Sequence, residues 1–311
     1  MSNLIAAQES ALPLRIAFSS AVAPSKNAYV FAVDVPFLAG VAEEEIFPPA
    51  TLFREENGLS LYRAGDLLIG CGFEKAAGGL LEGGTRRLYQ RIIHAVEGRH
   101  LYRMWNYVSR INAVTAELEH YRAFCRGRSI SFETALGTEY KRALPAASAV
   151  GSDDDRVAVV FVAGSALPKH VENPEQVPAY DYPEEHGPRS PSFSRATIAT
   201  ADGQSYVFVS GTAAIKGHAT IPGDLAGQVA TTRDNLRLIS QATGIGDNLG
   251  AKDRWTRHFK VYLRNAADLL PARALLEGTL LQPADRVTWL RSDICRAALN
   301  IEIEATLVKK V

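Results

Sequence analysis

The pattern of hydrophobic and polar residues predicts a series of strands and helices in the first half of the chain. Short apolar runs bounded by Gly, Pro or Asp are typical of strands; they are 14–18, 29–35, 59–62, 67–73, 101–108 and 157–163. Residues 84–96 carry apolar side chains at helical spacing and are followed by Gly98. Residues 117–125 predict an amphipathic helix that ends near Gly127. This pattern favours helices between the strands.

The second half repeats that order. Residues 195–200 and 205–210 predict a hairpin, because Asp202 and Gly203 between them form a turn dipeptide. The other predicted elements are helices over 224–243 and 269–276 and strands over 259–263, 287–294 and 299–308. The repeat predicts two copies of one α+β unit, a domain over residues 1–165 and a domain over residues 166–311. Residues 168–191, rich in Pro and polar residues, join the two halves. A loop of this length is usually a functional segment or a linker, and its aromatic and Arg content favours a functional segment.

The last predicted strand carries two acidic residues. With a period of two, Ile301, Ile303, Ala305 and Leu307 are expected to face the core, and Glu302, Glu304 and Thr306 the opposite side. The matching strand of the first half, 157–163, has no acid. The carboxyl groups are therefore specific to the second unit. Beside an apolar pocket such a group has a raised pKa and transfers protons near neutral pH; the alternative is a half-exposed strand with solvated carboxylates.

Arginine and tyrosine residues supply candidate anion contacts. Arg291 lies on the strand before Glu302, and the two strands are interpreted as a hairpin that places both residues in one site. Arg189 follows Gly-Pro, which restrains its backbone. Together with Tyr180 and Tyr182 these arginines predict an anion pocket, since the planar guanidinium forms two parallel hydrogen bonds with a carboxylate. The alternative for each arginine is a surface role.

Composition excludes several classes of function. The 34 basic and 34 acidic residues give no net charge, which argues against nucleic acid as a partner. Three cysteines are too few for a disulfide framework, which is consistent with the cytoplasm. The N-terminus lacks the pattern of a secretory signal, and no apolar run is long enough to span a membrane. The seven histidines show no metal-binding spacing, and phosphate-loop, dinucleotide and nucleophile-elbow motifs are absent from the sequence. We therefore expect an acid–base enzyme that acts on a small anionic metabolite, without a metal or cofactor.

From residue 187 to the C-terminus, several motifs resemble the RidA (YjgF) family. They are Gly-Pro-Arg at 187–189, YVFVSGT at 206–212, TRDNL at 232–236, Arg-Ser at 291–292 and IEIEA at 301–305. In that family the Arg of the Arg-Ser pair and the first Glu of the terminal strand belong to the ligand site. The resemblance places these roles on Arg291 and Glu302.

Motifs along nearly the whole chain resemble the chorismatase family. They are YRMWNY at 102–107, YRAFCRGR at 121–128, PAAS at 145–148, ENP at 172–174 and GPRSPSF at 187–193. The resemblance implies an α+β fold of two RidA/YjgF-like (chorismate-mutase-like) units with mixed β-sheets packed against helices. The first unit would be degenerate and the second catalytic, with no cofactor. One departure is His186, where an aromatic residue such as Tyr is expected before Gly-Pro-Arg.

The resemblance also implies a reaction, the conversion of chorismate to 3-hydroxybenzoate and pyruvate. Glu302 would protonate the enolpyruvyl ether, and the ring hydroxyl would displace pyruvate intramolecularly. Cys295, seven residues before Glu302 in the same predicted hairpin, favours this product because 3-hydroxybenzoate-forming members carry Cys there. No His lies at a spacing that would activate it as a nucleophile. The substrate-binding candidates are Arg291, Arg189, Tyr182, Tyr180, Gly211, Tyr262 and Arg264.

Several alternatives remain open at this stage. The chain could hydrolyse chorismate to 3,4-dihydroxycyclohexa-1,5-dienoate, or release both 3- and 4-hydroxybenzoate. Outside this reaction class, it could be a RidA-like imine deaminase or a protein that binds the metabolite without converting it. Because RidA units associate as trimers, both a monomer and a homotrimer are compatible with the sequence.

Overall fold

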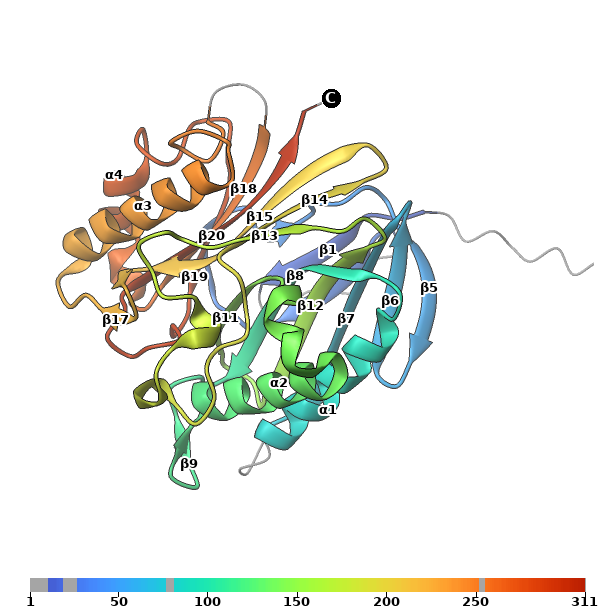
Figure 1. The fold of residues 1–311 in the computed structure, drawn as a ribbon. Coiled ribbons are helices and arrows are strands. Elements are labelled where there is room, and N and C mark those ends of the chain that lie inside the picture. The colour runs from blue at the N-terminus through green and yellow to red at the C-terminus, as the bar shows by residue number, and fades with distance from the viewer. Residues whose placement is uncertain (1–10, 19–26, 77–80, 252–254, 311) are drawn as a thin grey trace, which may run out of the picture.

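A computed structural model describes residues 11–18, 27–76, 81–251 and 255–310 (Figure 1). The region examined for a secretory signal lies mostly outside these residues. In the described chain, a six-stranded sheet has the order β11-β8-β12-β7-β6-β5. Its strands are β5 (Thr51–Glu56), β6 (Leu59–Ala64), β7 (Leu67–Lys75), β8 (His100–Ser109), β11 (Ala146–Ser152) and β12 (Arg156–Gly164). The helices α1 (Leu81–Ala95) and α2 (His120–Leu136) belong to the same half.

The second half forms a sheet with the order β13-β14-β15-β20-β18-β19-β3. Its strands are β13 (Lys169–Val171), β14 (Ala196–Ala201), β15 (Gln204–Ala213), β18 (Trp255–Leu263), β19 (Arg286–Arg291), β20 (Ile301–Lys309) and, from the first half, β3 (Phe37–Gly40). The helices α3 (Leu225–Ala242) and α4 (Leu269–Leu276) accompany this sheet. Asp224 caps α3 by accepting a hydrogen bond from the Gly227 amide at 2.9 Å.

Smaller elements complete the described chain. They are the sheet of β1 (Leu14–Phe18), β2 (Tyr29–Val33) and β4 (Glu43–Glu44), the pairs β9 (Val114–Thr115) with β10 (Leu118–Glu119) and β16 (Ile215–Lys216) with β17 (Ala219–Thr220), and the 3₁₀ turns η1 (Gly137–Ala143), η2 (Ala179–Asp181), η3 (Glu184–His186) and η4 (Ala266–Asp268). None of the helices in the described ranges is both long and apolar enough to cross a membrane.

The two large sheets share one strand order. Three antiparallel strands (β5–β7 or β13–β15) are followed by a helix, a strand, a second helix and two strands, and the final strand inserts next to the third. Each sheet is mixed, because β8 with β11 and β18 with β19 are parallel pairs. The predicted repeat of one α+β unit is therefore confirmed. The boundary at residue 165 stays a prediction, and β3 shows that the first half also supplies an edge strand to the second sheet.

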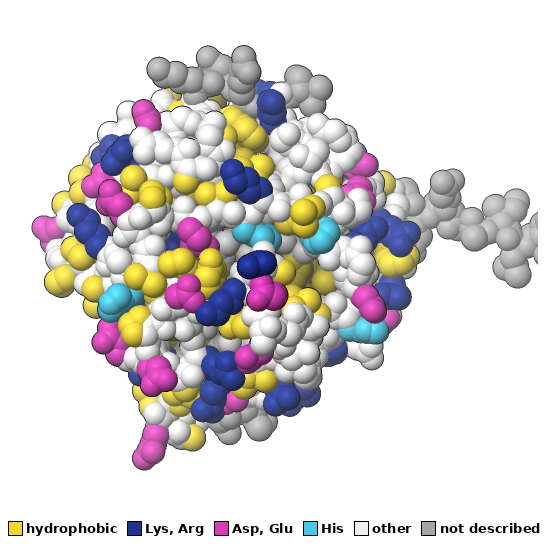
Figure 2. Space-filling view, in the orientation of Figure 1, with side chains coloured by type: hydrophobic (Ala, Val, Ile, Leu, Met, Phe, Trp, Pro, Cys, Tyr) yellow, Lys and Arg dark blue, Asp and Glu magenta, His cyan; other side chains and the backbone are white. Residues whose placement is uncertain are grey.

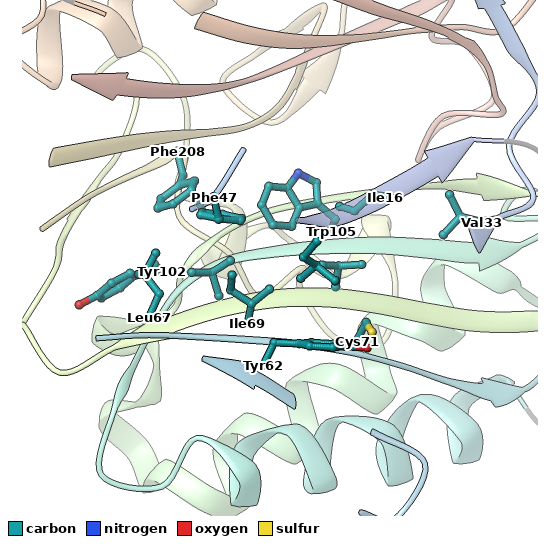
Figure 3. Close-up of a cluster of buried hydrophobic side chains, with 14 of the residues drawn as sticks. Ile16, Val33, Phe47, Tyr62, Leu67, Ile69, Cys71, Tyr102, Trp105 and Phe208 are labelled. Atoms are coloured by element: carbon teal, nitrogen blue, oxygen red, sulfur yellow. The ribbon is translucent and has the colours of Figure 1, made fainter. Parts of the chain in front are cut away.

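Figure 1 shows α1 and α2 on one side of the molecule and α3 and α4 on the other, with the sheets between them. One apolar cluster lies between α1, α2 and the first sheet, and a second lies between α3, α4 and the second sheet. A third cluster fills the space between the two sheets, where Phe47, Trp105 and Phe208 meet (Figure 3). Both sheets are thus buried on two faces.

Two sequence expectations are corrected by the structure. The predicted helix does not end near Gly127; α2 continues to Leu136. The glycine allows two helices to approach closely, since a Cβ at this position would lie 2.6 Å from the Glu82 carbonyl oxygen of α1. The strands over 287–294 and 299–308 do not form a hairpin, because β18 lies between β19 and β20 and pairs with both.

The face of β20 that carries glutamates is buried against the first unit, together with cations from both sheets. Arg103 on β8 donates hydrogen bonds to Glu304 Oε2 at 2.7 Å and Ser148 Oγ at 2.9 Å. The Lys260 ammonium on β18 lies 2.9 Å from Glu304 Oε1 and also binds Glu44 of β4. All four charged side chains are at least nine-tenths buried, and two cations balance two anions. We call Arg103, Lys260, Glu304 and Glu44 the intersheet ion cluster.

Removal of one cation is expected to leave a carboxylate buried without its partner. We predict that Lys260→Met lowers the free energy of unfolding by about 3–5 kcal/mol, the cost of breaking a buried ion pair. Chemical denaturation followed by circular dichroism measures the change. Lys216→Met, at an exposed position on β16, is the matched control. A change below about 1 kcal/mol would mean that the intersheet ion cluster contributes no more to the free energy of unfolding than a surface ion pair, and would contradict the prediction.

Candidate active site

A cavity of about 280 Å³ lies where the first turn of α2 meets β15, β20 and the loop before β20. Most of its walls come from the second unit, and Glu119, Tyr121 and Arg122 come from the first. The described residues that line it include Glu119, Gln176, Tyr182, His186, Phe193, Arg195, Gly211, Thr212, Ile215, Cys295, Arg296 and Glu302. Its position between the two units explains why neither half contains the complete set of residues.

Glu302 supplies a buried carboxyl group to this cavity. Its side chain is buried, and its Oε1 has no hydrogen-bond partner among the described residues. The Cys295 thiol lies 3.9 Å from Oε2 and donates a weak hydrogen bond to it. Burial raises the pKa of Glu302 to about 8, and the charge of the neighbouring Glu304 adds to the rise. Glu302 therefore holds a proton at neutral pH and can act as an acid.

Glu304 on the same strand is ionised, whereas Glu302 is protonated. Burial acts against its ionisation, but Lys260 and Arg103 together hold its pKa below the ordinary value. The two carboxyl groups lie on one face of β20 and differ in their neighbours: Glu304 contacts both cations, whereas Glu302 faces the cavity. Environment thus separates one structural carboxylate from one neutral acid.

Gly211 provides the space for the Glu302 carboxyl. It lies in the irregular stretch between Val209 and Thr212, where the pairing of β15 with β20 shifts register. A Cβ at this position would lie 2.1 Å from Glu302 Oε1 and 3.2 Å from the Ser148 Cβ. A larger residue would displace the carboxyl from the cavity, so glycine is required for this geometry.

Among the described residues, three arginines line the cavity: Arg122, Arg195 and Arg296. Arg195 is only 4% exposed and donates to the Tyr182 hydroxyl at 2.7 Å. Arg296 donates to the His218 carbonyl oxygen at 2.8 Å and is 5.3 Å from the centre of the Tyr182 ring. Arg122 lies in the first turn of α2, where the helix dipole also favours an anion. The arrangement can bind a ligand that carries more than one carboxylate.

The loop that carries Cys295 and Arg296 is held by Arg264. Its guanidinium donates to four oxygens of this loop, at Leu299 (2.7 Å), Asp293 (2.8 Å), Arg296 (3.0 Å) and Ile294 (3.4 Å). Burial raises the pKa of the Cys295 thiol well above its ordinary value. Cys295 therefore stays a thiol, which disfavours a role as nucleophile.

Comparison with known proteins identifies the family. The model of "Chorismatase FkbO/Hyg5-like, N-terminal" domains matches residues 50–163. The 3-hydroxybenzoate synthase of Streptomyces hygroscopicus is 35% identical over 267 residues, which cover 82% of this chain and 77% of that protein. The chain belongs to the chorismatase family. A chorismatase of Streptomyces rapamycinicus is 34% identical, over 81% of this chain and 77% of its own length. A crystal structure of a chorismatase superposes with a TM-score of 0.80 at 27% identity, and the match covers 99% of this chain and 95% of that one.

The cavity of this chorismatase-family protein contains four of the residues proposed from sequence: Glu302, Cys295, Tyr182 and Gly211. The other proposed residues do not line it. Arg291 lies 3.3 Å from the Asp153 carboxylate, and β18 separates its strand from β20. Arg189 is exposed and binds Glu133 of α2 at 2.8 Å. The anion pocket expected around these two arginines is therefore not formed.

The three remaining candidates lie outside the cavity. Arg264 positions the loop, as described above. Tyr262 is fully buried on β18 directly opposite Glu302 in the strand pairing. Tyr180 packs against the core of the first unit. None of the three is among the residues that line the cavity.

Sequence reasoning missed the three arginines that do line the cavity. Arg122 belongs to the YRAFCRGR motif of the family resemblance, and Arg296 directly follows Cys295. The family resemblance could therefore have indicated both residues as candidates. Arg195 directly precedes β14, and no motif or periodicity in the sequence marks it. Its place in the cavity is therefore visible only in the tertiary structure.

The charge of Glu302 is expected to affect folding stability in a pH-dependent way. Its folded pKa of about 8 exceeds its ordinary value of 4.5, so between these limits the folded state binds more protons than the unfolded state. The contribution of Glu302 to the free energy of unfolding therefore falls as the pH rises from about 4.5 to 8, and the folded chain becomes less stable. Glu302→Gln removes this contribution, because the amide does not ionise.

Denaturation at pH 5.5 and pH 8.5 tests this prediction. We expect Glu302→Gln to gain stability relative to the unmodified chain on moving to the higher pH. Glu277→Gln, at an exposed position, should show no such gain. Equal differences at both pH values would mean that Glu302 has an ordinary pKa.

Proposed function

We propose that this protein cleaves chorismate to 3-hydroxybenzoate and pyruvate. The observation that carries the proposal is a neutral, buried Glu302 carboxyl in one cavity with three arginine side chains. Chorismate is a dicarboxylate with an enolpyruvyl ether on a cyclohexadiene ring. It therefore needs cationic partners for its carboxylates and an acid for its ether, and this cavity offers both.

In this proposal the substrate carboxylates bind Arg195, Arg296 and Arg122. These residues replace Arg189 and Arg291, which lie away from the cavity. Arg195 is held against Tyr182, and Arg296 is held by the backbone of His218, so both are oriented before the substrate binds. Pre-orientation reduces the entropy that binding costs. Phe193 and Ile215 provide apolar walls for the ring.

The proposed reaction begins with proton transfer from Glu302. The carboxyl proton moves to the methylene carbon of the enolpyruvyl group, which becomes a methyl group and leaves an oxocarbenium-like carbon. The Glu302 carboxylate then stabilises that positive charge. The oxygen of the neighbouring ring hydroxyl attacks the ring carbon that carries the ether, the ether C–O bond breaks, and pyruvate leaves as the keto acid. The hydroxyl proton passes to the Glu302 carboxylate. The resulting epoxide opens by breaking the original hydroxyl C–O bond, and loss of the hydrogen from the attacked ring carbon restores the aromatic ring as 3-hydroxybenzoate.

Cys295 is proposed to select the product. Its thiol occupies the space beside Glu302 Oε2, and its raised pKa keeps it uncharged. A 3-hydroxybenzoate synthase is among the relatives of this chain, which supports the same product here. Hydrolysis to the dihydroxydiene and release of 4-hydroxybenzoate are the competing outcomes within this reaction class.

The pH dependence of turnover tests the role of Glu302. Because the protonated form is the acid, we expect kcat/KM for chorismate to fall as pH rises through about 8. Glu302→Gln is expected to lose pyruvate release, by at least about a hundredfold as for a general acid, and to remain folded. A lactate dehydrogenase-coupled assay measures pyruvate, and Glu277→Gln is the matched control.

Retention of turnover by Glu302→Gln would contradict this mechanism. Binding of chorismate without any pyruvate release by the unmodified chain would indicate a metabolite-binding protein. Release of ammonia from an imine, with chorismate left intact, would indicate the deaminase alternative.

The product distribution tests the role of Cys295. We expect Cys295→Val to shift the product from 3-hydroxybenzoate toward the dihydroxydiene, with pyruvate still released. Liquid chromatography of the reaction mixture measures the ratio. Cys71→Val, a buried cysteine between the sheets and away from the cavity, is the control. An unchanged ratio in Cys295→Val would exclude Cys295 as the residue that selects the product.

A further inference from the structure

Two histidines and a glutamate meet at the edge of the cavity, although they are far apart in the sequence. Glu185 and His186 lie in η3, and His218 lies in the turn between β16 and β17. His186 Nε2 is 2.9 Å from His218 Nδ1. Glu185 Oε1 is 3.3 Å from each of these two nitrogens. The three ligand atoms thus form a nearly equilateral triangle.

That triangle has the size of one face of a tetrahedral metal site. With metal–ligand distances of about 2.0–2.1 Å, two ligands of a tetrahedral zinc ion lie about 3.3–3.4 Å apart. Two of the three separations have this length, and the His186–His218 separation is shorter by a few tenths of an ångström. Two imidazole nitrogens with one carboxylate oxygen suit Zn²⁺ and similar ions better than Mg²⁺ or Ca²⁺, which prefer oxygen ligands alone.

Solvent can reach this cluster. The side chain of Glu185 is 65% exposed and that of His218 is 38% exposed, whereas His186 is 20% exposed. An ion bound by all three would keep an open coordination position for water. Two positive charges, Arg296 and Arg122, act on His186, and Arg296 also donates to the backbone oxygen of His218; the Glu185 carboxylate supplies the opposite charge.

The cluster also joins two segments that border the cavity. His186 lines the cavity, and its ring centre is 5.2 Å from that of Tyr182, the partner of Arg195. His218 lies in the turn whose backbone oxygen orients Arg296. An ion held between η3 and the β16–β17 turn would therefore connect the segments that position two of the cavity arginines.

We propose that Glu185, His186 and His218 bind a divalent cation of the Zn²⁺ class, and that the bound ion restrains η3 and the β16–β17 turn at the edge of the cavity. The ion lies apart from Glu302 and takes no part in proton transfer. Occupancy is expected to slow substrate entry and product release. Only this effect on turnover rests on the proposed function; the binding itself does not.

Titration with Co²⁺ tests the binding. Co²⁺ replaces Zn²⁺ and absorbs visible light strongly in a tetrahedral site. We expect one equivalent to bind to the full chain, prepared metal-free and without a polyhistidine tag. Glu185→Gln and His218→Gln should each weaken binding by about tenfold or more, at least the effect of losing an outer-shell partner. Glu184→Gln in the same turn and His94→Gln, both exposed, are the matched controls.

Two results would overturn the site. One is the absence of a tetrahedral Co²⁺ spectrum in the unmodified chain at millimolar metal. The other is equal affinity of His218→Gln and His94→Gln for Co²⁺.

A separate measurement tests the effect on turnover. The rate of pyruvate release with and without Zn²⁺ is compared within each variant, so that any change in basal rate cancels. Zn²⁺ should slow the unmodified chain and His94→Gln severalfold and His218→Gln much less. Equal slowing of all three would overturn the restraint at the cavity edge while the Co²⁺ result stands. A lack of pyruvate release by the unmodified chain without metal would overturn the proposed function and leave the binding result intact.

Discussion

The burial of Glu304 between two cations is the interaction on which the rest of the site depends. Arg103 comes from the first sheet and Lys260 from the second, so the carboxylate joins the two units. Arg103 pairs with Glu304, and Lys260 pairs with Glu304 and Glu44; within the described ranges neither cation forms an ion pair with the carboxyl of Glu302. An acidic side chain in that position is more stable with its proton than without it. The same arrangement that joins the units therefore produces the neutral acid in the cavity.

The duplicated architecture gives the two units different roles. The matching strand of the first unit, β12, carries apolar residues where β20 carries Glu302 and Glu304. The first unit contributes Arg103, Ser148 and the first turn of α2 instead. By covering the polar face of the second sheet, it excludes water from Glu302 and so raises its pKa. A second unit alone would expose that face and leave the carboxyl ionised.

The cavity combines a rigid floor with an edge made of short segments. Glu302, Gly211 and Arg195 lie on or beside long strands, and their positions follow from sheet register. The edge consists of η3, the β16–β17 turn and the loop before β20. His218 joins them by its contacts with His186 and Arg296, and Arg264 at the end of β18 holds the loop. On the face shown in Figure 2, basic and acidic side chains are intermixed without a continuous basic area.

The sequence by itself determined the local elements and the face of β20 that carries the acids. Alternation over 301–307 placed Glu302 and Glu304 on the face of the strand opposite its apolar residues, and the Asp202–Gly203 turn, with positive φ at both residues, predicted the β14–β15 hairpin. The tertiary structure alone decided that β18 inserts between β19 and β20, that α2 passes Gly127, and that Arg195 and Arg296, not Arg189 and Arg291, line the cavity that contains Glu302. Periodicity reports which side of an element is buried, because that depends on neighbours a few residues away. Strand order and the contacts between distant side chains depend on how whole elements pack, and local sequence patterns do not contain that information.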